Sequence, residues 1–227
     1  MLQVIATPIG NLGDITLRAL EALKSCDAIA AEDTRHSLRL LRHYEIQKPL
    51  ISLHEHNEGR RIGELLSRLQ DGATLALVTD AGMPLISDPG YRLVAACHEA
   101  EIEVTVLPGP SAVPTALAGS GLPPLPFQFR GFLPVKSGQR QKALTQAVES
   151  GMTSLFFESP HRLVKSLNVL QTVAPDCQVC VARELTKTFE EFRRGDPATL
   201  ASHYENKPPK GEITLLIYRA TDKKRDA

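Results

Sequence analysis

Short apolar runs alternate with amphipathic helical patterns along almost the whole chain. Leucines at near-helical spacing, such as Leu17, Leu20 and Leu23, indicate helices with one apolar face between the runs. The first 110 residues contain five apolar runs of strand length, at 2–7, 27–32, 49–56, 73–80 and 103–109. Because these runs are almost continuously apolar, both faces of the strands should be covered by helices. The pattern predicts an α/β domain with a largely parallel sheet.

The same alternation returns in the second half of the chain. Strands are expected at 127–133, 153–158, 178–184, 189–195 and 212–219, and helices at 137–149, 161–173 and 197–205. Between the halves lies a segment rich in Pro and Gly, in which Pro123, Pro124 and Pro126 disfavour a continuous helix or a central strand. We therefore expect two domains, residues 1–112 and 113–227, with a frayed tail at 220–227.

Composition narrows the class of protein. The 227 residues are 42% hydrophobic and 23% charged, which is typical of a globular protein and excludes a disordered or collagen-like chain. No run approaches the roughly 20 apolar residues of a membrane span, and the N-terminus lacks the basic and long apolar segments of a signal peptide. We therefore expect a cytoplasmic protein without membrane contact.

The formal charge is zero, but the charges are unevenly distributed. The first 110 residues hold 10 basic and 15 acidic side chains, whereas the remainder holds 16 basic and 11 acidic ones. Such an asymmetry is a pointer to contact with a polyanion, although chance scatter of surface charge explains it about as well. Net charge therefore excludes only a uniformly basic surface.

Several common motifs are missing. No GxGxxG follows the first strand, no GxxxxGK[ST] phosphate loop occurs, and HEHN at 54–57 is not HExxH. Cys177 and Cys180 form one CxxC, but an offset of three in a strand directs the two side chains to opposite faces. We expect reduced, structural cysteines and no metal site.

Five loops rich in Gly, Pro and small polar residues follow predicted strands. They lie at 7–14, 31–35, 79–90, 108–112 and 156–162. Each alone is explained as a turn. Because open parallel sheets bind ligands at the carboxyl ends of their strands, five such loops together favour a shared ligand crevice.

The sequences of these loops, together with three further motifs, resemble those of a known protein family. TPIGNLGDIT, AEDTRHS, DAGMPLISDPGY, LPGPSA, GFLP, FESPHRL, ARELTK and KGEITLLI follow one another over about residues 3 to 218. Together they resemble the ribosomal RNA small subunit methyltransferase I group of the tetrapyrrole methylase superfamily. The resemblance implies two α/β domains of the tetrapyrrole methylase type, with S-adenosyl-L-methionine in a cleft between them. It also implies a cytoplasmic homodimer that methylates the ribose 2′-hydroxyl of a cytidine in the decoding centre of 16S rRNA, as naked rRNA or in the small ribosomal subunit.

The resemblance also assigns residues to the cofactor. These are Pro8, Ile9, Gly10, Asp80, Gly82, Met83, Ile86, Ser111, Ala112, Phe157, Ile213 and Thr214. For Asp80, a role in a turn or helix cap explains the residue as well as cofactor binding does. Two departures stand out: Met83 occupies a position where the group is expected to have Thr, and the chain stops soon after KGEITLLI, whereas many relatives continue.

Methyl transfer to a ribose hydroxyl needs a base or a nearby cation as the proton leaves. The candidates at the expected crevice are Glu32, Asp33, Arg35, Glu158, Arg183 and Lys187, with His161 and Glu184 beside them, and no single base is assigned. The acidic pair of AEDTR could instead cap the following helix. Arg162 and Arg183 could hold phosphates or pair with Glu158 and Glu184.

The stretch 104–148 contains no acidic residue. We expect Arg130, Lys136, Arg140 and Lys142, together with Arg193 and Arg194, to face the RNA, with a solvated helix face as the alternative.

Three other functions are weighed against this one. The first is a non-catalytic cofactor-binding or ribosome-assembly module, and the second is a tetrapyrrole-type small-molecule methyltransferase. A metal-dependent phosphohydrolase using Asp80, Asp88 and Glu158 is more distant.

Overall fold

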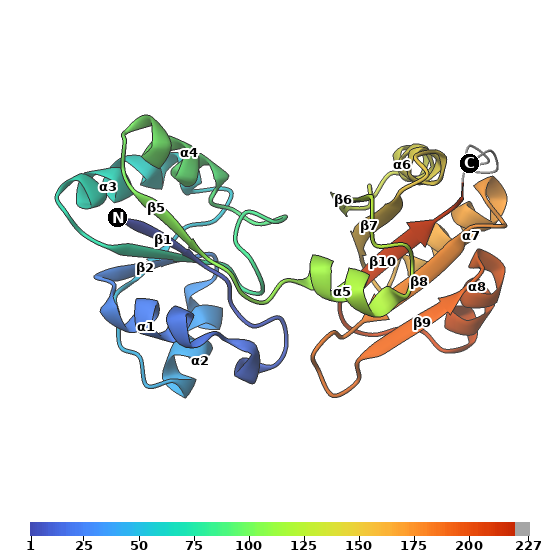
Figure 1. Cartoon of the computed structure of the whole chain (residues 1–227), viewed down its shortest axis with the longest axis horizontal. Helices are drawn as coiled ribbons and strands as arrows, with labels where there is room; N and C mark the ends of the chain where they lie inside the picture. The colour runs from blue at the N-terminus through green and yellow to red at the C-terminus, as the bar shows by residue number, and fades with distance from the viewer. Residues whose placement is uncertain (221–227) are drawn as a thin grey trace. The chain divides into compact units, whose positions relative to one another are not determined.

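Figure 1 shows the computed structural model of the chain, which describes residues 1–220. The chain divides into two compact units, Met1–Ser111 and Ala112–Ala227, and the expected boundary lies one residue later. The tail that the sequence predicts to fray lies, from residue 221 onward, outside the described residues. Each unit has its own sheet and its own hydrophobic core, so each is described by itself.

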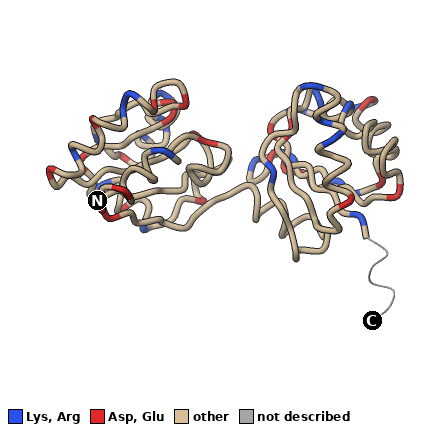
Figure 2. The backbone as a smooth tube through the Cα atoms, turned by 90° about the horizontal axis from the view of Figure 1, so that it is seen from above, with Lys and Arg blue, Asp and Glu red and all other residues tan. Residues whose placement is uncertain are grey.

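The first unit is built on a five-stranded sheet. Its strands are β1 (Leu2–Ile5), β2 (Ala28–Ala31), β3 (Leu50–Ser52), β4 (Leu75–Val78) and β5 (Val104–Leu107), in the order β3-β2-β4-β1-β5. Every neighbouring pair is parallel, which confirms the predicted sheet type. All five strands lack charged residues, and Figure 2 shows the charges of this unit on its helices and loops.

Helices cover both faces of this sheet, as the apolar strand runs predict. Helices α1 (Leu17–Ser25) and α2 (Thr34–His43) lie on one face, and α3 (Glu58–Gln70) and α4 (Tyr91–Glu99) on the other (Figure 1). Successive strand residues alternate between the two cores: Ile5 packs with α1 and α2, whereas Val4 packs with α3 and α4. Burying each such side chain contributes about 1.5–3 kcal/mol.

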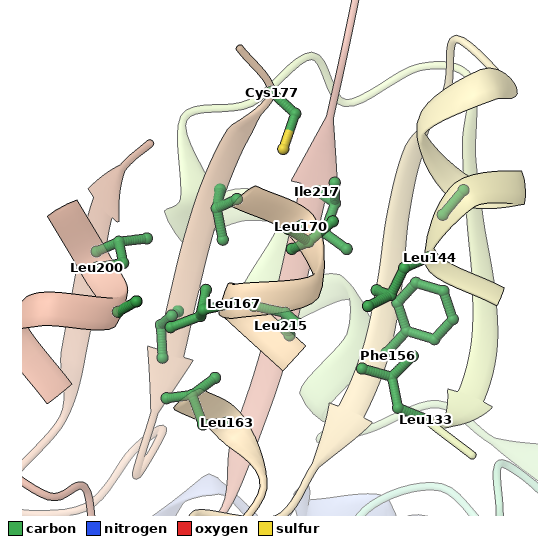
Figure 3. Packing of buried hydrophobic residues seen from close by; sticks show 14 of the residues in the cluster. Leu133, Leu144, Phe156, Leu163, Leu167, Leu170, Cys177, Leu200, Leu215 and Ile217 are labelled. Atoms are coloured by element: carbon green, nitrogen blue, oxygen red, sulfur yellow. The ribbon is translucent and has the colours of Figure 1, made fainter. Parts of the chain in front are cut away.

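The second unit has a mixed sheet. Its strands are β6 (Phe127–Phe132), β7 (Thr153–Glu158), β8 (Gln178–Arg183), β9 (Glu191–Gly195) and β10 (Ile213–Tyr218), in the order β6-β7-β10-β8-β9. Only β6 and β7 are parallel among the described pairs. Helices α6 (Ser137–Glu149), α7 (Leu163–Val173) and α8 (Pro197–Asn206) pack onto one face, where Figure 3 shows Leu144, Leu167 and Leu200 against the strands.

The Pro- and Gly-rich segment between the halves contains a short helix, α5 (Ala112–Ser120), which the sequence pattern did not predict. Pro114 lies in the first turn, where a helix has no use for the missing N–H, and the prolines that stop the pattern come after the helix. Helix α5 packs against β8, β9 and β10. Gly119 permits this contact because a Cβ there would overlap the ring of Phe192 on β9.

The four cysteines are buried and form no disulfide, which confirms the structural assignment. None of the helices in the described chain is both long and apolar enough to cross a membrane.

Candidate functional site

The strand order of the first unit creates a point where neighbouring loops diverge. From β1 the chain passes through α1 to β2, whereas from β4 it passes through α4 to β5, and α1 and α4 lie on opposite faces of the sheet. Because β1 and β4 are neighbours, the loops at their carboxyl ends lead to opposite faces of the sheet at this topological switch point. Ligands of open α/β sheets bind at such points.

The loops at the switch point are joined by hydrogen bonds. The Thr7 N–H donates to the Gly82 carbonyl at 2.9 Å, and the Gly82 N–H donates back to the Thr7 carbonyl at 2.9 Å. The Thr7 hydroxyl donates to the carbonyl of Thr79 at 3.1 Å. The loop 79–90 is therefore fixed to the end of β1 at its upstream side.

Gly82 is the place where three loops meet. Its φ of +88° favours glycine, and a Cβ there would lie 3.3 Å from Ile9 Cγ2 and 3.8 Å from the carbonyl oxygen of Pro110. Of the residues assigned to the cofactor, Ile9, Gly82 and Ser111 are thus brought together, while Gly10 and Ile86 are exposed near them in sequence. Pro8 adjoins Ile9, and Met83 packs against the core under α3 and α4.

Carboxylates line the same edge of the sheet. Glu32 accepts a hydrogen bond of 2.7 Å from the Thr79 hydroxyl, and Asp80 accepts one of 3.1 Å from the Asp33 N–H. Among the described ion pairs, none involves Glu32, Asp80 or Asp88. No Lys or Arg of the described chain therefore forms an ion pair with these three carboxylates, an arrangement that suits a cationic ligand.

Asp88 is the carboxyl most affected by this environment. Burial, followed by repulsion from Glu32 and Asp80, raises its pKa from 3.8 to about 7, although a hydrogen bond with Thr79 opposes the rise. The sequence suggested Asp88 only as a metal ligand. That Asp88 lies near Glu32 could not be predicted, because it depends on the pairing of β2 with β4.

We expect Asp88→Asn to remove a pH dependence of stability. The folded protein binds the Asp88 proton more tightly than the unfolded chain does, so the free energy of unfolding should fall as pH rises from about 4 through about 7. In Asp88→Asn this decline should be smaller, so the variant should gain stability relative to wild type at pH 8 and not at pH 4. Urea unfolding at the two pH values measures the difference, and a constant difference would contradict it.

Asp33 has the capping role that the sequence allows as an alternative. Its side chain accepts from the Arg35 N–H at 2.8 Å at the start of α2 and pairs with the Arg35 guanidinium at 2.8 Å. The hydrogen bonds from Arg35 lower the pKa of Asp33 to about 2. The carboxylate of Asp33 is therefore occupied by the first turn of α2 and by Arg35, whose side chain is 89% exposed.

In the second unit, one sheet edge gathers several predicted residues. Register places Thr214 opposite Phe157, and Ile213 opposite both Glu158 and Arg183. The Phe157 ring packs against the rings of Phe129 and Phe132 in T-shaped arrangements, with centroid distances of 4.8 and 5.3 Å.

Glu158 is buried in a way that argues against a catalytic role. Its side chain has no exposed surface and pairs with Arg162 at 2.8 Å. It also accepts hydrogen bonds from the Ser159 N–H at 2.7 Å and the Ser166 hydroxyl at 2.6 Å. A carboxylate held by three donors and closed to solvent is a structural group, and we withdraw it from the candidate bases.

Arg183 and Lys187 are also engaged within the unit. Arg183 pairs with Glu191 at 3.2 Å, whereas the sequence suggested Glu158 or Glu184 as its partner. Lys187 donates to Glu184 at 2.8 Å and to Glu212 at 2.9 Å. Burial lowers the pKa of Lys187, but these two acceptors outweigh it and raise the pKa above its usual value, so Lys187 is a cation and not a base.

The residues expected to face RNA divide into two groups. The prediction that Arg140 faces the RNA is corrected. Arg140 is only 6% exposed, and its guanidinium turns inward to donate to the carbonyl of Val135. Arg193 is tied to Glu191 at 2.7 Å. Those left on the surface are Arg130, which donates to Gln146, and the exposed Lys136, Lys142 and Arg194.

In residues 1–220, no three His, Cys, Asp or Glu side chains are arranged to hold a metal ion.

Comparison with known proteins agrees with this fold. The family model of the tetrapyrrole (corrin/porphyrin) methylases matches residues 1–201. A solved cobalt precorrin-4 methyltransferase of cobalamin biosynthesis superposes with a TM-score of 0.68 at 18% identity, covering 96% of this chain and 94% of that one. At this identity the likeness concerns the fold alone.

Curated relatives are much more similar in sequence. The ribosomal RNA small subunit methyltransferase I of Synechocystis sp. is 49% identical over 99% of this chain and 81% of its own length. That of Thermotoga maritima is 47% identical over 95% of this chain and 97% of its own. That of Escherichia coli O157:H7 is 48% identical over 95% and 77%. The chain belongs to the tetrapyrrole methylase family and, within it, to the ribosomal RNA small subunit methyltransferase I group.

Proposed function

We propose that the chain transfers a methyl group from S-adenosyl-L-methionine to 16S rRNA in the small ribosomal subunit, at the ribose 2′-hydroxyl of a cytidine in the decoding centre. The observation that carries the proposal is the convergence of three loops on Gly82 at the switch point, beside carboxylates without cationic partners. The names of the relatives supply the substrate class, small-subunit rRNA.

The residues around this switch point fit the cofactor. S-adenosyl-L-methionine supplies, when bound, a methyl group activated by a positively charged sulfonium. Glu32, Asp80 and Asp88 favour that charge, and Gly82 allows the loops after β1, β4 and β5 to approach one another closely. Holding donor and acceptor in line lowers the barrier by roughly 7–11 kcal/mol. The predicted contacts of Ala112, Phe157, Ile213 and Thr214 stay predictions.

The proton of the attacking hydroxyl needs an acceptor. Since Glu158 is buried, Asp33 caps α2 and Lys187 is protonated, Glu32 is the base that we retain from the predicted candidates. We add Asp88, whose pKa is raised in part by the nearby Glu32. A pKa near 7 matches the neutral pH at which a general base works best, which favours Asp88.

The proposal is tested by binding and transfer together. Calorimetry should detect S-adenosyl-L-methionine binding, and labelled cofactor should transfer its methyl group to small subunits purified from a strain that lacks the modification. Binding without transfer would instead support a non-catalytic module, and transfer to a tetrapyrrole would support a small-molecule enzyme. Naked 16S rRNA, run in parallel, decides whether the assembled subunit is required.

We infer that Lys136, the N-cap of α6, and Lys142, within α6, contact the RNA backbone. Both are exposed, and no acidic residue occurs between 104 and 148. The double variant Lys136→Glu with Lys142→Glu should raise the KM for small subunits roughly ten-fold at low salt. Each lost phosphate contact reduces the number of counterions released on binding, and the affinity falls with it. Affinity for S-adenosyl-L-methionine should stay unchanged.

The matched control is Lys165→Glu, an exposed lysine on α7. If it weakens methylation as much as the double variant, or if the double variant behaves like wild type, the assignment of this surface is wrong.

We further infer from the family resemblance that the protein acts in the cytoplasm as a homodimer. Sedimentation velocity tests the second part, since a single monomeric species at micromolar concentration would contradict it.

A further inference from the structure

The loop 79–90 contains strained backbone. Leu85 and Ser87 have φ values of +72° and +70°, a region that residues other than glycine rarely adopt. Such residues persist only where the surrounding structure holds them in place. The Thr7–Gly82 hydrogen bonds hold the upstream end of the loop, so something else must fix the downstream end.

The downstream end leads into α4, which has no capping side chain of its own. Its N-cap is Gly90, with a φ of +119°. The first N–H groups of a helix need acceptors from outside it. Here a residue more than 30 positions earlier in the sequence supplies them.

That residue is Glu58, at the start of α3. Its Oε1 accepts hydrogen bonds from the N–H groups of Gly90 at 3.1 Å, Arg92 at 3.1 Å and Leu93 at 3.4 Å. Glu58 is 6% exposed, and its negative charge lies at the positive end of α4. A Cβ on residue 90 would approach Leu77 Cδ2 to 2.8 Å, so this close packing also requires a glycine.

We propose that Glu58 is a positioning residue that holds the loop 79–90 in the shape that receives the cofactor. It acts through the backbone of Gly90 and the start of α4, from beneath the loop. The inference rests on the proposed function, because it is there that the loop is given a role in binding S-adenosyl-L-methionine.

Three variants test the idea. Glu58→Ala removes the acceptor, Glu58→Gln keeps one oxygen acceptor but no charge, and Glu64→Ala is the control. Glu64 lies on the same helix and pairs with Arg61 at 2.6 Å and Arg68 at 2.9 Å, away from the loop. Glu58→Ala should raise both the Kd and the KM for S-adenosyl-L-methionine roughly ten-fold or more, while kcat at saturating cofactor stays within about three-fold.

Hydrogen exchange supplies a second measurement. The amides of Gly90, Arg92 and Leu93 should exchange faster in Glu58→Ala, with a smaller change and a partial recovery of KM in Glu58→Gln. Glu64→Ala should match wild type in KM and in the exchange of these amides. If Glu58→Ala does not fold, Glu58→Gln alone should still show a raised KM.

The outcomes separate the two proposals. A role in folding alone would reduce the active fraction while leaving KM unchanged, and that result would overturn the inference. So would an unchanged KM in both Glu58 variants. A wild-type protein that neither binds S-adenosyl-L-methionine nor transfers its methyl group would contradict the proposed function itself.

Discussion

Replacing Gly82 with valine is expected to weaken S-adenosyl-L-methionine binding roughly 100-fold and to lower methyl transfer at limiting cofactor by a similar factor. Gly82 has a φ of +88°, which a β-branched residue adopts only at a cost of about 1–2 kcal/mol. The new Cβ would lie 3.3 Å from Ile9 Cγ2, and the branches would extend into the space where the loops after β1, β4 and β5 converge. Overpacking of this kind adds about 1–3 kcal/mol.

Gly72→Val is the matched control for this effect. Gly72 also has a positive φ, of +94°, but a Cβ there would meet nothing within 4 Å. This variant should lose stability from backbone strain and keep its cofactor affinity. Calorimetry on both proteins makes the comparison. A folded Gly82→Val protein that binds S-adenosyl-L-methionine as tightly as wild type would show that the cofactor lies elsewhere.

Glu158→Ala is expected to show the largest loss of stability, about 3–5 kcal/mol in the free energy of unfolding, because it leaves the charge of Arg162 without its buried partner. The Ser166 hydroxyl and the Ser159 N–H also lose their acceptor. Urea unfolding monitored by circular dichroism measures the loss. In contrast, kcat per folded molecule should stay within about three-fold of wild type, because a positioned base would contribute 10²–10⁴-fold.

Two further variants distinguish a structural role of Glu158 from a catalytic one. Glu205→Ala, an exposed carboxylate on α8, should change stability by no more than about 0.5 kcal/mol. Glu158→Gln keeps the shape but not the charge, so it too should lose stability before activity. A Glu158→Gln protein as stable as wild type but with turnover reduced a hundred-fold would restore Glu158 as the base.

The strand pattern was enough to predict the parallel sheet, because a strand covered on both faces must be apolar throughout. It did not predict α5, which lies in the Pro- and Gly-rich segment and ends before Pro123; Pro114 lies in its first turn, where a helix tolerates proline. Local sequence also indicated which loops lie at the carboxyl ends of strands. Their convergence on Gly82 depends instead on the order β4-β1-β5, which only the folded sheet determines.

The roles of polar residues were harder to predict, because burial is a tertiary property. Arg140 sits in an acid-free stretch, as an RNA contact would, but the first turn of α6 directs it inward. Glu158 is the last residue of β7, a position where a catalytic carboxylate is expected, yet Arg162 and Ser166 in the following segment enclose it. Glu58 matches no local motif, since the amides it binds are 32 to 35 residues away in sequence.

The central claim is that this protein methylates a ribose in small-subunit rRNA. It is tested most directly by digesting the labelled RNA to nucleosides after incubation of modification-deficient small subunits with the protein and methyl-labelled S-adenosyl-L-methionine. We expect one labelled nucleoside, 2′-O-methylcytidine, from the decoding centre, and roughly 100-fold less label with Gly82→Val at limiting cofactor. Label on a base, or cofactor binding with no label in the RNA, would contradict it.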